Sequence, residues 1–583
     1  MIEIDVENGY LHVRSKYDAR IVSFMRSQED RYWDSNKREW RIPEESLDKL
    51  LELASDLGYE YSLKRTESSS VEYGDIPDNY HFKTEPYKHQ IEGVEYGLAH
   101  SKFLLTDEQG LGKTKQMIDL AEIKKLNGEV KHVLIVACVN GLKYNWRNEV
   151  STHSYDTGYI LGTRYTKKGR ERIGSNQDRL DDLKLLGTGS EIDNHFFIIT
   201  NIETLRYNKS IQVPMKTKKN GQTRYKKQTV FPIVDEINKK IKDGLISMVV
   251  VDEMHRCKDP NSLQGRAVLS ISCDNMVALT GTPIMNRPLD AYAPLAWLGY
   301  ENRSFFQFRK YYCVMGGFNA HDVVGYKHLP ELQAVLDKCM LRRLKSEVLD
   351  LPEKIYINDY VEMTPSQVDL YNDVLNDITE NIDKIELTPN PLTMLIRLRQ
   401  VTGNPSILSS TVKGNPKYDR MLEIIEDVVA EGKKAIVYSN WTDVLLPAYE
   451  LAMKKGYNPA LYTGQNVKER EQQKEMFKTS NSCKVIFGTI GAMGTGLTLT
   501  EATTVIFLDE PWNRAIKDQC EDRVHRIGTS ESPNIITIMC RGTIDEKIND
   551  IVYRKGKLSD IILDKEEDIM TNKQLLNYLL QTN

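Results

Sequence analysis

Short, uninterrupted runs of apolar residues recur along this chain, and polar residues follow each of them. Runs of this length are typical of strands that are buried on both faces, which is the situation in parallel sheets. Helical stretches lie between the runs, so the pattern predicts a doubly wound α/β architecture. The runs form two sets, at residues 103–105, 133–139, 196–199, 248–251 and 277–279, and at residues 435–438, 485–487, 505–508 and 535–538. We therefore expect two α/β lobes.

The remaining segments suggest how the chain is divided. Residues 300–410 lack such runs and are expected to form a mainly helical insertion or linker region. The first lobe then covers residues 85–299 and the second lobe residues 411–558. Residues 559–583 carry leucines at helical spacing, which predicts a helical tail.

Residues 1–62 predict a small separate module. Asn8-Gly9 lies between two alternating runs, which is a strong hairpin signal because both residues tolerate positive φ. A two-residue turn there would pair Val6 with Leu11 and Ile4 with Val13.

The rest of this module follows the same reasoning. Ser15 is a candidate N-cap for a first helix. A second strand pair is expected near residues 32–33 and 40–42, and a second helix ends at Gly58. The predicted order is ββαββα, and the polar residues 63–84 are expected to form a linker.

The net charge limits how the chain can bind nucleic acid. Its 583 residues include 78 Lys and Arg against 83 Asp and Glu, a formal net charge of −5. This excludes binding through bulk positive charge. A local basic patch is still sufficient, because salt screens charges beyond about 8 Å.

One segment supplies such a patch. Between Lys209 and Ile233 there is no acidic residue, and Asn220-Gly221 near the centre predicts a projecting hairpin. An ordinary solvated loop is the alternative. The residues expected to contact DNA are Lys216, Lys218, Lys219, Arg224, Lys226 and Lys227, together with Trp512.

The cysteines and the N-terminus suggest a cellular location. The eight cysteines form no Cys-x-x-Cys pair, so we expect reduced thiols and no zinc site. The N-terminus lacks the features of a signal peptide, and no apolar run approaches the roughly 20 residues of a membrane span. We expect a cytoplasmic monomer, in a bacterium or a virus-infected host cell rather than in a nucleus.

A glycine-rich segment follows the apolar run at 103–105 and precedes a helical stretch. Its glycines would let backbone N–H groups surround a phosphate, and the helix N-terminus adds positive potential. Asp107 occupies the first Gly position of the strict P-loop pattern, so on this segment alone an incidental loop remains an alternative. The residues expected to bind ATP here are Gly110, Leu111, Gly112, Lys113 and Thr114, with Lys113 at the β- and γ-phosphates and Thr114 on Mg²⁺.

Two carboxylates follow the run at 248–251. Asp252 can help to hold Mg²⁺, and Glu253 can orient and deprotonate the attacking water. Their order after a P-loop favours a catalytic role over a solvated Asp-Glu pair.

Arg523 and Arg526 come 410 or more residues later, at i and i+3 spacing. This spacing predicts two guanidinium groups on one helix face. They could stabilise charge on a transferring phosphoryl group, although an ordinary surface helix is the alternative.

Taken together, these motifs resemble the Swi/Snf-type ATPases of helicase superfamily two, over roughly residues 80–555. Further agreeing stretches include residues 86–90, 145–149, 198–203, 279–283, 341–354, 400–405, 488–499 and 512–513. The resemblance implies two RecA-like lobes that close on ATP. It also implies nucleotide contacts by Gln90 and Gly496, and coupling to DNA through His255, Thr280 and Gln519.

The sequence departs from this family's pattern at four positions. They are Met254, Met493, Arg514 and Thr529, where a small residue, Gly, Pro and Gln are usual. None of these changes removes a group that performs chemistry.

The first module has a narrower resemblance. Tyr32-Trp33-Asp34, Lys37 to Trp40 and the Leu-rich helix resemble the HARP (HepA-related protein) module of annealing helicases. A small aromatic core is the alternative.

The leading hypothesis is a double-stranded-DNA translocase, driven by ATP and Mg²⁺, that remodels or reanneals forked DNA. One alternative is a strand-separating helicase, or the motor of a restriction, defence or nucleoprotein-displacing complex. Another is a nucleotide-gated DNA-binding scaffold with little turnover, which the intact Lys113, Glu253, Arg523 and Arg526 disfavour. A protein partner would bind through the N-terminal module or the C-terminal helix.

Overall fold

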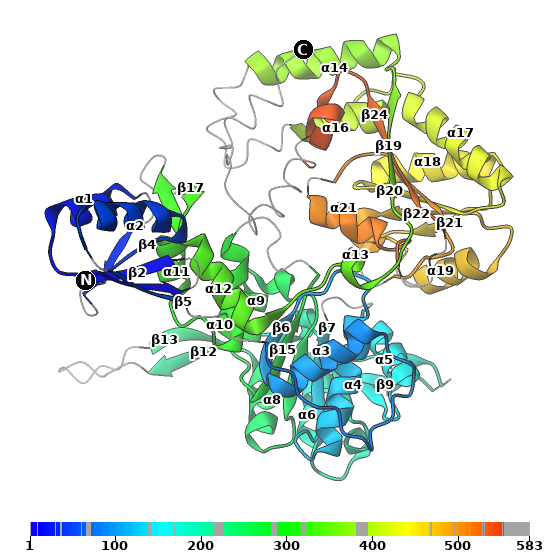
Figure 1. Ribbon diagram of the computed structural model, residues 1–583. Helices are drawn as coiled ribbons and strands as arrows, with labels where there is room; N and C mark the ends of the chain where they lie inside the picture. The colour runs from blue at the N-terminus through cyan, green and yellow to red at the C-terminus, as the bar shows by residue number, and fades with distance from the viewer. Residues whose placement is uncertain are drawn as a thin grey trace. The chain divides into compact units, whose positions relative to one another are not determined.

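The computed structural model of the chain divides into two units, which are described separately (Figure 1). The first unit comprises Met1–Asp107 and Lys113–Arg342, and the second comprises Glu108–Gly112 and Arg343–Asn583. The structure describes residues 2–7, 10–28, 31–34, 38–59, 61–65, 71–137, 142–167, 169–214, 225–281, 288–316, 322–380, 395–466, 469–493, 497–511, 513–526, 529, 531–550 and 552.

The N-terminal module of the first unit is a five-stranded sheet with two helices. Its strand order is β3-β4-β2-β1-β5. Val6 pairs with Leu11 and Ile4 with Val13, so the predicted hairpin register is confirmed. The elements are β1 (Ile2–Glu7), β2 (Tyr10–Ser15), α1 (Ala19–Ser27), β3 (Tyr32–Asp34), β4 (Glu39–Pro43), η1 (Glu44–Ser46), α2 (Leu47–Asp56) and β5 (Tyr61–Arg65).

Two details of this module differ from the sequence prediction. Helix α1 is capped by Asp18 and not by Ser15, because the Asp18 carboxylate accepts a hydrogen bond from the Arg20 N–H at 2.8 Å. Strand β5 crosses the predicted boundary at residue 62 and pairs in parallel with β1. A partner so distant in sequence leaves no local signal in a short polar strand.

A seven-stranded sheet forms the centre of the first unit, in the order β18-β6-β15-β14-β7-β11-β8. All of its pairings are parallel, and β7 and β14 are buried throughout, which confirms the predicted parallel-sheet fold of this part of the chain. Its strands are β6 (Lys102–Leu105), β7 (Val133–Ala137), β8 (Gly158–Ile160), β11 (Phe197–Asn201), β14 (Met248–Val251), β15 (Asn275–Leu279) and β18 (Met340–Leu341).

Helices and short strand pairs complete this unit. The helices are α3 (Lys88–Ala99), α4 (Lys113–Leu126), α5 (Leu142–His153), α6 (Asn176–Leu185), η2 (Glu191–Asn194), α7 (Ile202–Leu205), α8 (Pro232–Lys242), η3 (Met254–Cys257), α9 (Leu263–Leu269), η4 (Pro288–Ala291), α10 (Tyr292–Leu298), α11 (Phe305–Tyr312) and α12 (Leu329–Cys339). The strand pairs are β9 (Thr163–Tyr165) with β10 (Glu171–Ile173), β12 (Lys209–Pro214) with β13 (Tyr225–Val230), and β16 (Cys313–Gly316) with β17 (Asp322–Tyr326).

The second unit contains a six-stranded parallel sheet in the order β19-β24-β23-β20-β22-β21. This sheet confirms the predicted second set of parallel strands, although β19 lies before the predicted start of the lobe. The strands are β19 (Ile355–Val361), β20 (Ala435–Ser439), β21 (Ala460–Tyr462), β22 (Val485–Thr489), β23 (Thr504–Phe507) and β24 (Asn534–Cys540). The helices are α13 (Lys345–Val348), α14 (Pro365–Glu380), α16 (Leu395–Gly403), η7 (Pro405–Ile407), α17 (Pro416–Ala430), α18 (Thr442–Lys454), α19 (Arg470–Thr479), α20 (Ile490–Met493) and α21 (Arg514–Glu521).

The predicted helical region at 300–410 is only partly correct. It contains α11, α12, α14 and α16, but also β16, β17, β18 and the seven-residue strand β19. The chain passes from the first unit to the second at Arg342–Arg343, within this region. Strand β19 is an edge strand whose side chains are largely exposed, so it lacks the continuous apolar run that marks the buried strands.

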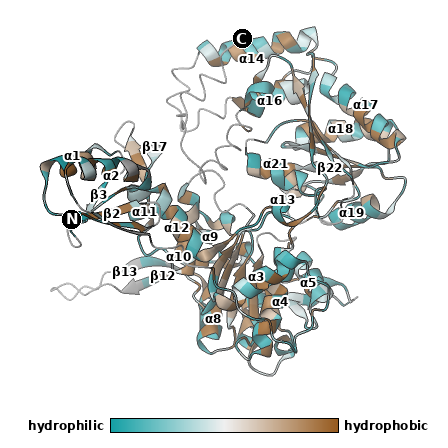
Figure 2. Ribbon diagram, viewed as in Figure 1, coloured by the Kyte–Doolittle hydropathy of each residue, from teal (hydrophilic) through white to brown (hydrophobic). Residues whose placement is uncertain are grey.

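Hydrophobic residues are concentrated in the two sheets, where Figure 2 shows them in brown. All seven cysteines that the structure describes are buried. Within the described ranges, no helix is long and apolar enough to span a membrane. The predicted tail at 559–583 lies outside the described residues.

Candidate active site

The glycine-rich segment joins β6 to α4, which begins at Lys113. Gly110 and Gly112 have φ angles of +94° and +76°, a region that only glycine adopts without strain. The Lys113 Nζ atom donates a hydrogen bond to the Asp107 carbonyl oxygen at 2.6 Å. The Lys113 ammonium group is therefore bonded to the residue that precedes the glycine-rich loop.

Asp107, which replaces the usual first glycine, has a structural role. Its carboxylate accepts a hydrogen bond from Gln116 Nε2 on α4 at 2.9 Å, and both side chains are buried. The aspartate at this position therefore links the start of the loop to helix α4 by a hydrogen bond. Gly110 and Gly112 are unaffected by this exchange.

Gln90 lies in the first turn of α3. Its Oε1 atom accepts a hydrogen bond from the Tyr87 N–H at 3.1 Å, and its side chain is buried. The structure fixes Gln90 at a helix start, and its contact with adenine stays a prediction.

Asp252 and Glu253 follow β14, and a tryptophan holds the first of them. The Trp146 Nε1–H on α5 donates to Asp252 Oδ2 at 2.9 Å, and the Glu253 N–H donates to Asp252 Oδ1 at 2.9 Å. Burial and the neighbouring Glu253 carboxylate raise the pKa of Asp252 to about 6. Glu253 itself has a left-handed backbone, with φ of +50°. Such strain in a residue other than glycine is concentrated at functional sites.

Two side chains of the first unit have the oxygen donors that a magnesium ion prefers. Mg²⁺ is commonly held by one or two protein groups together with substrate phosphates. Thr114 at the start of α4 offers a hydroxyl, and Asp252 after β14 offers a buried carboxylate whose pKa is raised by burial and by Glu253. No group of three or more His, Cys, Asp and Glu side chains suited to a metal occurs among the residues described.

His255 connects Glu253 to the end of the next strand. Its Nδ1 atom lies 3.2 Å from Glu253 Oε2 and 3.0 Å from Thr280 Oγ1, and both His255 and Thr280 are buried. The structure therefore brings together two of the residues predicted to couple nucleotide and DNA.

The second unit positions Arg523 and Arg526, but not on a helix face. Helix α21 ends at Glu521, and both arginines lie in the turn that follows. The turn is tightened because the N–H groups of Arg523 and Val524 donate three residues back. We call residues 522–526 the arginine turn.

Backbone oxygens orient both guanidinium groups. Arg523 Nε donates to the Gln519 carbonyl oxygen at 2.8 Å, and Arg526 Nε donates to the Asp522 carbonyl oxygen at 2.7 Å. Arg523 also donates to Leu497 O at 3.0 Å and to Gln109 Oε1, within the same unit, at 2.8 Å. Gln519 is buried, and its role in coupling stays a prediction.

Two of the departures from the family pattern have structural roles here. The Thr529 hydroxyl accepts from the Arg526 N–H at 3.1 Å and donates to Val524 O at 2.7 Å, which closes the arginine turn. Arg514 Nη2 donates to the Tyr356 hydroxyl on β19 at 2.9 Å.

Several predicted site residues lie outside the described part of the chain. They are Gly496, Trp512, Lys216, Lys218, Lys219 and Arg224. The backbone of Lys226 belongs to β13, and the Lys227 side chain on the same strand is exposed.

Trp146 was not assigned its own role by the sequence reasoning, although it falls in a stretch that resembles a family motif. A signal was available, because a buried indole N–H usually finds a hydrogen-bond partner. Lys345 and Lys354, which contact the arginine turn, were also missed.

The two parallel sheets and the glycine-rich segment before α4 define an α/β protein with a P-loop-like segment, and comparison with known proteins gives the family. The chain matches the SNF2-related domain over residues 17–407 and the helicase conserved C-terminal domain over residues 416–528, and it belongs to the SNF2-related family.

Individual relatives are more distant. The chain is 25% identical to an uncharacterized ATP-dependent helicase of Mycoplasma pneumoniae, over 88% of this chain and 46% of that protein. It is 28% identical to the mouse SWI/SNF-related matrix-associated actin-dependent regulator of chromatin subfamily A member 1, over 57% of this chain and 33% of that protein. The chain spans less than half the length of these relatives. A solved structure, the Sulfolobus solfataricus SWI2/SNF2 ATPase core in complex with dsDNA, matches at 23% identity and a TM-score of 0.36, covering 87% of this chain and all of that one.

Proposed function

We propose that this chain is a DNA-dependent ATP hydrolase that translocates along double-stranded DNA and remodels or reanneals forked DNA. The observation that carries the hydrolase assignment is the arrangement at the carboxyl end of β14. There Asp252 is fixed by Trp146, and Glu253 is linked through His255 to Thr280. Membership of the SNF2-related family supports the same assignment.

Each residue has a defined part in this proposal. Lys113 neutralises the β- and γ-phosphates, and Glu253 accepts the proton of the attacking water. Mg²⁺, held by Thr114 and Asp252, would spread the negative charge of the phosphates. Arg523 and Arg526 donate hydrogen bonds to the transferring phosphoryl group.

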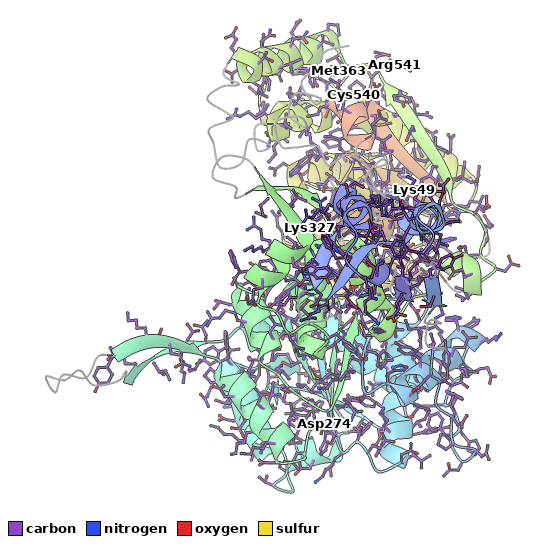
Figure 3. All side chains as sticks on the ribbon, turned by 60° about the vertical axis from the view of Figure 1, so that its left-hand side comes forward. Lys49, Asp274, Lys327, Met363, Cys540 and Arg541 are labelled. Atoms are coloured by element: carbon purple, nitrogen blue, oxygen red, sulfur yellow. The ribbon has the colours of Figure 1, made fainter. Side chains whose placement is uncertain are left out.

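The proposed DNA contact is the basic ribbon, which we define as β12 and β13. Figures 1 and 3 show these strands extending away from the rest of the first unit. The two strands pair antiparallel, with Lys209 opposite Val230 at one end and Pro214 opposite Tyr225 at the other. This pairing agrees with the hairpin predicted around Asn220-Gly221. The tip at residues 215–224 lies outside the described residues.

One face of the basic ribbon suits DNA. Gln212 lies opposite Lys227, and Tyr225 lies two residues from Lys227 on the same strand, so these three side chains share a face by strand alternation. Tyr225 is 60% exposed, and Lys227 and Gln212 are exposed as well. A two-stranded ribbon fits the major groove of B-DNA, and lysine supplies charge for its phosphates.

The preference for forked DNA rests on the N-terminal module. Trp33 on the edge strand β3 is 44% exposed, and its ring packs against Trp40 at 5.3 Å between centroids. An exposed aromatic ring can stack on an unpaired base, as a fork presents.

ATP hydrolysis should be measured with no DNA and with double-stranded, single-stranded and forked DNA, and with RNA. We expect stimulation by double-stranded DNA and the largest stimulation by forked DNA. If no nucleic acid stimulates ATP hydrolysis, the proposal that the chain is a DNA-driven motor is contradicted. Stimulation by single-stranded DNA alone would favour a strand-separating helicase, and nucleotide-dependent DNA binding without turnover would favour a scaffold.

A further inference from the structure

A short segment of the second unit grips the end of the helix that carries the arginine turn. This segment, residues 345–356, follows the point where the chain enters the unit at Arg343. It includes α13 and the start of β19. We call it the clasp, because Lys345, Pro352, Lys354 and Tyr356 all bond to α21 or to the arginine turn.

Lys345 contacts the arginine turn at both ends. Its Nζ atom lies 2.7 Å from Asp522 Oδ1 and donates to the His525 carbonyl oxygen at 2.9 Å. The side chains of Lys345 and Asp522 are only 4% and 2% exposed. A single buried ammonium group therefore spans the turn from Asp522 to His525.

Lys354 holds the same turn from a second position. Its Nζ atom lies 3.1 Å from Asp522 Oδ1 and 3.0 Å from Glu521 Oε2. The Tyr356 hydroxyl donates to Glu521 Oε2 at 2.8 Å, and Arg514 donates to that hydroxyl. The last residue of α21 and the first residue of the turn are thus both fixed by the clasp.

The ring of His525 adds a further contact. Its Nε2 atom lies 2.9 Å from the carbonyl oxygen of Pro352, which lies between Lys345 and Lys354 in the sequence. The clasp therefore contacts Glu521, Asp522 and His525 through side chains and backbone alike.

These contacts bear directly on the two arginines. The Asp522 carbonyl oxygen accepts the hydrogen bond that orients Arg526, while the Asp522 carboxylate is held by both lysines. Arg523 lies next to Asp522, and its guanidinium is oriented from Gln519 on the same helix end. A shift of Asp522 would therefore move the anchor of Arg526 and the backbone of Arg523.

A buried ion-pair cluster is weak evidence for stability, because desolvation of the charges opposes their attraction. It does impose geometry, since each charge has few alternative partners in the interior. Catalysis that depends on positioned guanidinium groups loses about 100-fold from a displacement near 1 Å. Geometry is the property that an arginine pair acting on a phosphoryl group requires.

We propose that Lys345 and Lys354 are positioning residues that hold the arginine turn in its working geometry. This inference rests on the proposed ATP hydrolysis. Neither lysine contacts the nucleotide in this proposal, and both act through Asp522 on Arg523 and Arg526. The clasp then acts on the rate of hydrolysis and not on the affinity for ATP.

The test uses the full chain with Lys354→Met and Lys354→Arg, since Lys354 is the less buried of the two lysines. We expect Lys354→Met to lower kcat by about 10- to 100-fold, with KM for ATP and the affinity for a fluorescent ATP analogue changed by less than about twofold. Lys354→Arg should retain more of the rate than Lys354→Met, because it keeps the positive charge and N–H donors, although its larger planar head group changes the geometry.

Lys417→Met is the matched control. Lys417 is also a buried lysine of the second unit, paired with Asp545 at 2.7 Å, and it is 1% exposed. Its Nζ atom also donates to the Leu508 carbonyl oxygen at 2.9 Å, and neither Leu508 nor Asp545 belongs to α21 or the arginine turn. We expect its loss to lower the melting temperature without a specific fall in kcat. An equal fall in kcat for Lys417→Met and Lys354→Met at matched folded fractions would overturn the inference.

A second measurement tests the route through the arginines. If Lys354 acts through Arg526, the double variant Lys354→Met/Arg526→Ala should hydrolyse ATP no more slowly than Arg526→Ala alone. Fully additive losses would overturn the inference. This comparison also serves if Lys354→Met folds poorly, because Tyr356→Phe can replace it in the same cycle with a smaller effect on packing.

The two proposals fail in different ways. A wild-type chain without ATP hydrolysis under any nucleic acid would contradict the proposed function. A wild-type chain that hydrolyses ATP, with Lys354→Met equally active, would contradict only the role of the clasp.

Discussion

The Nδ1 atom of His255 lies 3.0 Å from the hydroxyl oxygen of Thr280, at the ends of the neighbouring strands β14 and β15. The same nitrogen lies 3.2 Å from the Glu253 carboxylate. One imidazole ring therefore contacts both the proposed catalytic base and the start of the Thr280-Gly281 segment. A movement of Thr280 would therefore shift the His255 ring and change its contact with Glu253, and the reverse also holds. Coupling between ATP hydrolysis and DNA binding requires a physical connection of this kind.

Thr280→Val should weaken this coupling, because valine keeps the shape of the side chain and removes the hydroxyl. We expect basal ATP hydrolysis within about twofold of wild type and a DNA stimulation reduced by about tenfold, since one buried hydrogen bond contributes roughly 1 kcal/mol or more. ATPase rates across a DNA titration provide the measurement.

Thr200→Val is the control for this substitution. Thr200 is a buried threonine of β11 in the same sheet, and its hydroxyl has no hydrogen-bond partner within the described residues. It should retain full stimulation. Normal stimulation of Thr280→Val would remove the His255–Thr280 contact from the coupling mechanism.

Glu253→Gln should bind ATP and fail to hydrolyse it. The amide keeps the size of the carboxylate but cannot accept the proton of the attacking water. A loss of about 100-fold or more in kcat is expected, with nucleotide affinity nearly unchanged. Single-turnover hydrolysis and equilibrium binding of a fluorescent ATP analogue measure the two effects. Glu149→Gln, on the exposed side of α5, is the matched control. Undiminished turnover in Glu253→Gln would reject its role as the base.

The sequence predicts the two sheets well, because their central strands are covered on both faces and therefore need continuous apolar runs. The β1–β2 register was also predictable, since Asn8-Gly9 dictates a short turn and alternation then fixes the partners. Strand β19 was missed for the opposite reason. It lies at a sheet edge, and its partner β24 is more than 150 residues distant in sequence.

The candidate site shows the same division. The glycines, Lys113 and the carboxylates after β14 are local motifs with defined spacing, so the sequence alone identifies them. The contact between Trp146 and Asp252 joins residues 106 positions apart and has no local pattern. The end of α21 at Glu521 was missed as well, because the partners that fix the arginine turn lie on the clasp.

Neutralising Lys227 on the proposed DNA-binding face of the basic ribbon should weaken DNA binding and reduce its salt dependence. Lys227→Gln removes one charge from the face that Lys227 shares with Gln212 and Tyr225. If Lys227 contacts a phosphate, the slope of log K against log salt should fall in magnitude by about 0.9. Binding isotherms at several salt concentrations measure the slope.

Lys242→Gln removes the same charge from α8, outside the ribbon. This control should keep the wild-type slope. If the ribbon variant and the α8 variant have equal slopes, the ribbon does not bind the DNA backbone.

Acid should destabilise the second unit through Asp522. Burial alone would raise the pKa of this carboxyl, but Lys354 and Lys345 outweigh it and hold the pKa well below its usual range. The folded state then binds fewer protons than the unfolded state. This stabilisation is therefore complete well above the unfolded pKa of about 3.9, begins to fall near pH 5, and is lost as the pH falls towards the lower pKa of the folded state. Glu521, whose pKa is also lowered despite burial because Lys354 and Arg514 face it, acts in the same direction.

Asp522→Asn should therefore lower stability near pH 7 by about 3–5 kcal/mol, because it leaves two buried ammonium groups without this partner. Its stability should also depend less steeply on pH between about 5 and 3 than that of the wild type. Hydrogen exchange of the peptide covering residues 514–526, measured from pH 7 to pH 3 with correction for intrinsic rates, reports this region directly. Asp427→Asn, which removes an exposed carboxylate from α17 of the same unit, should behave as wild type. If Asp522→Asn retains the full wild-type pH dependence, the acid sensitivity arises at other carboxylates and the charge on Asp522 does not fix the arginine turn.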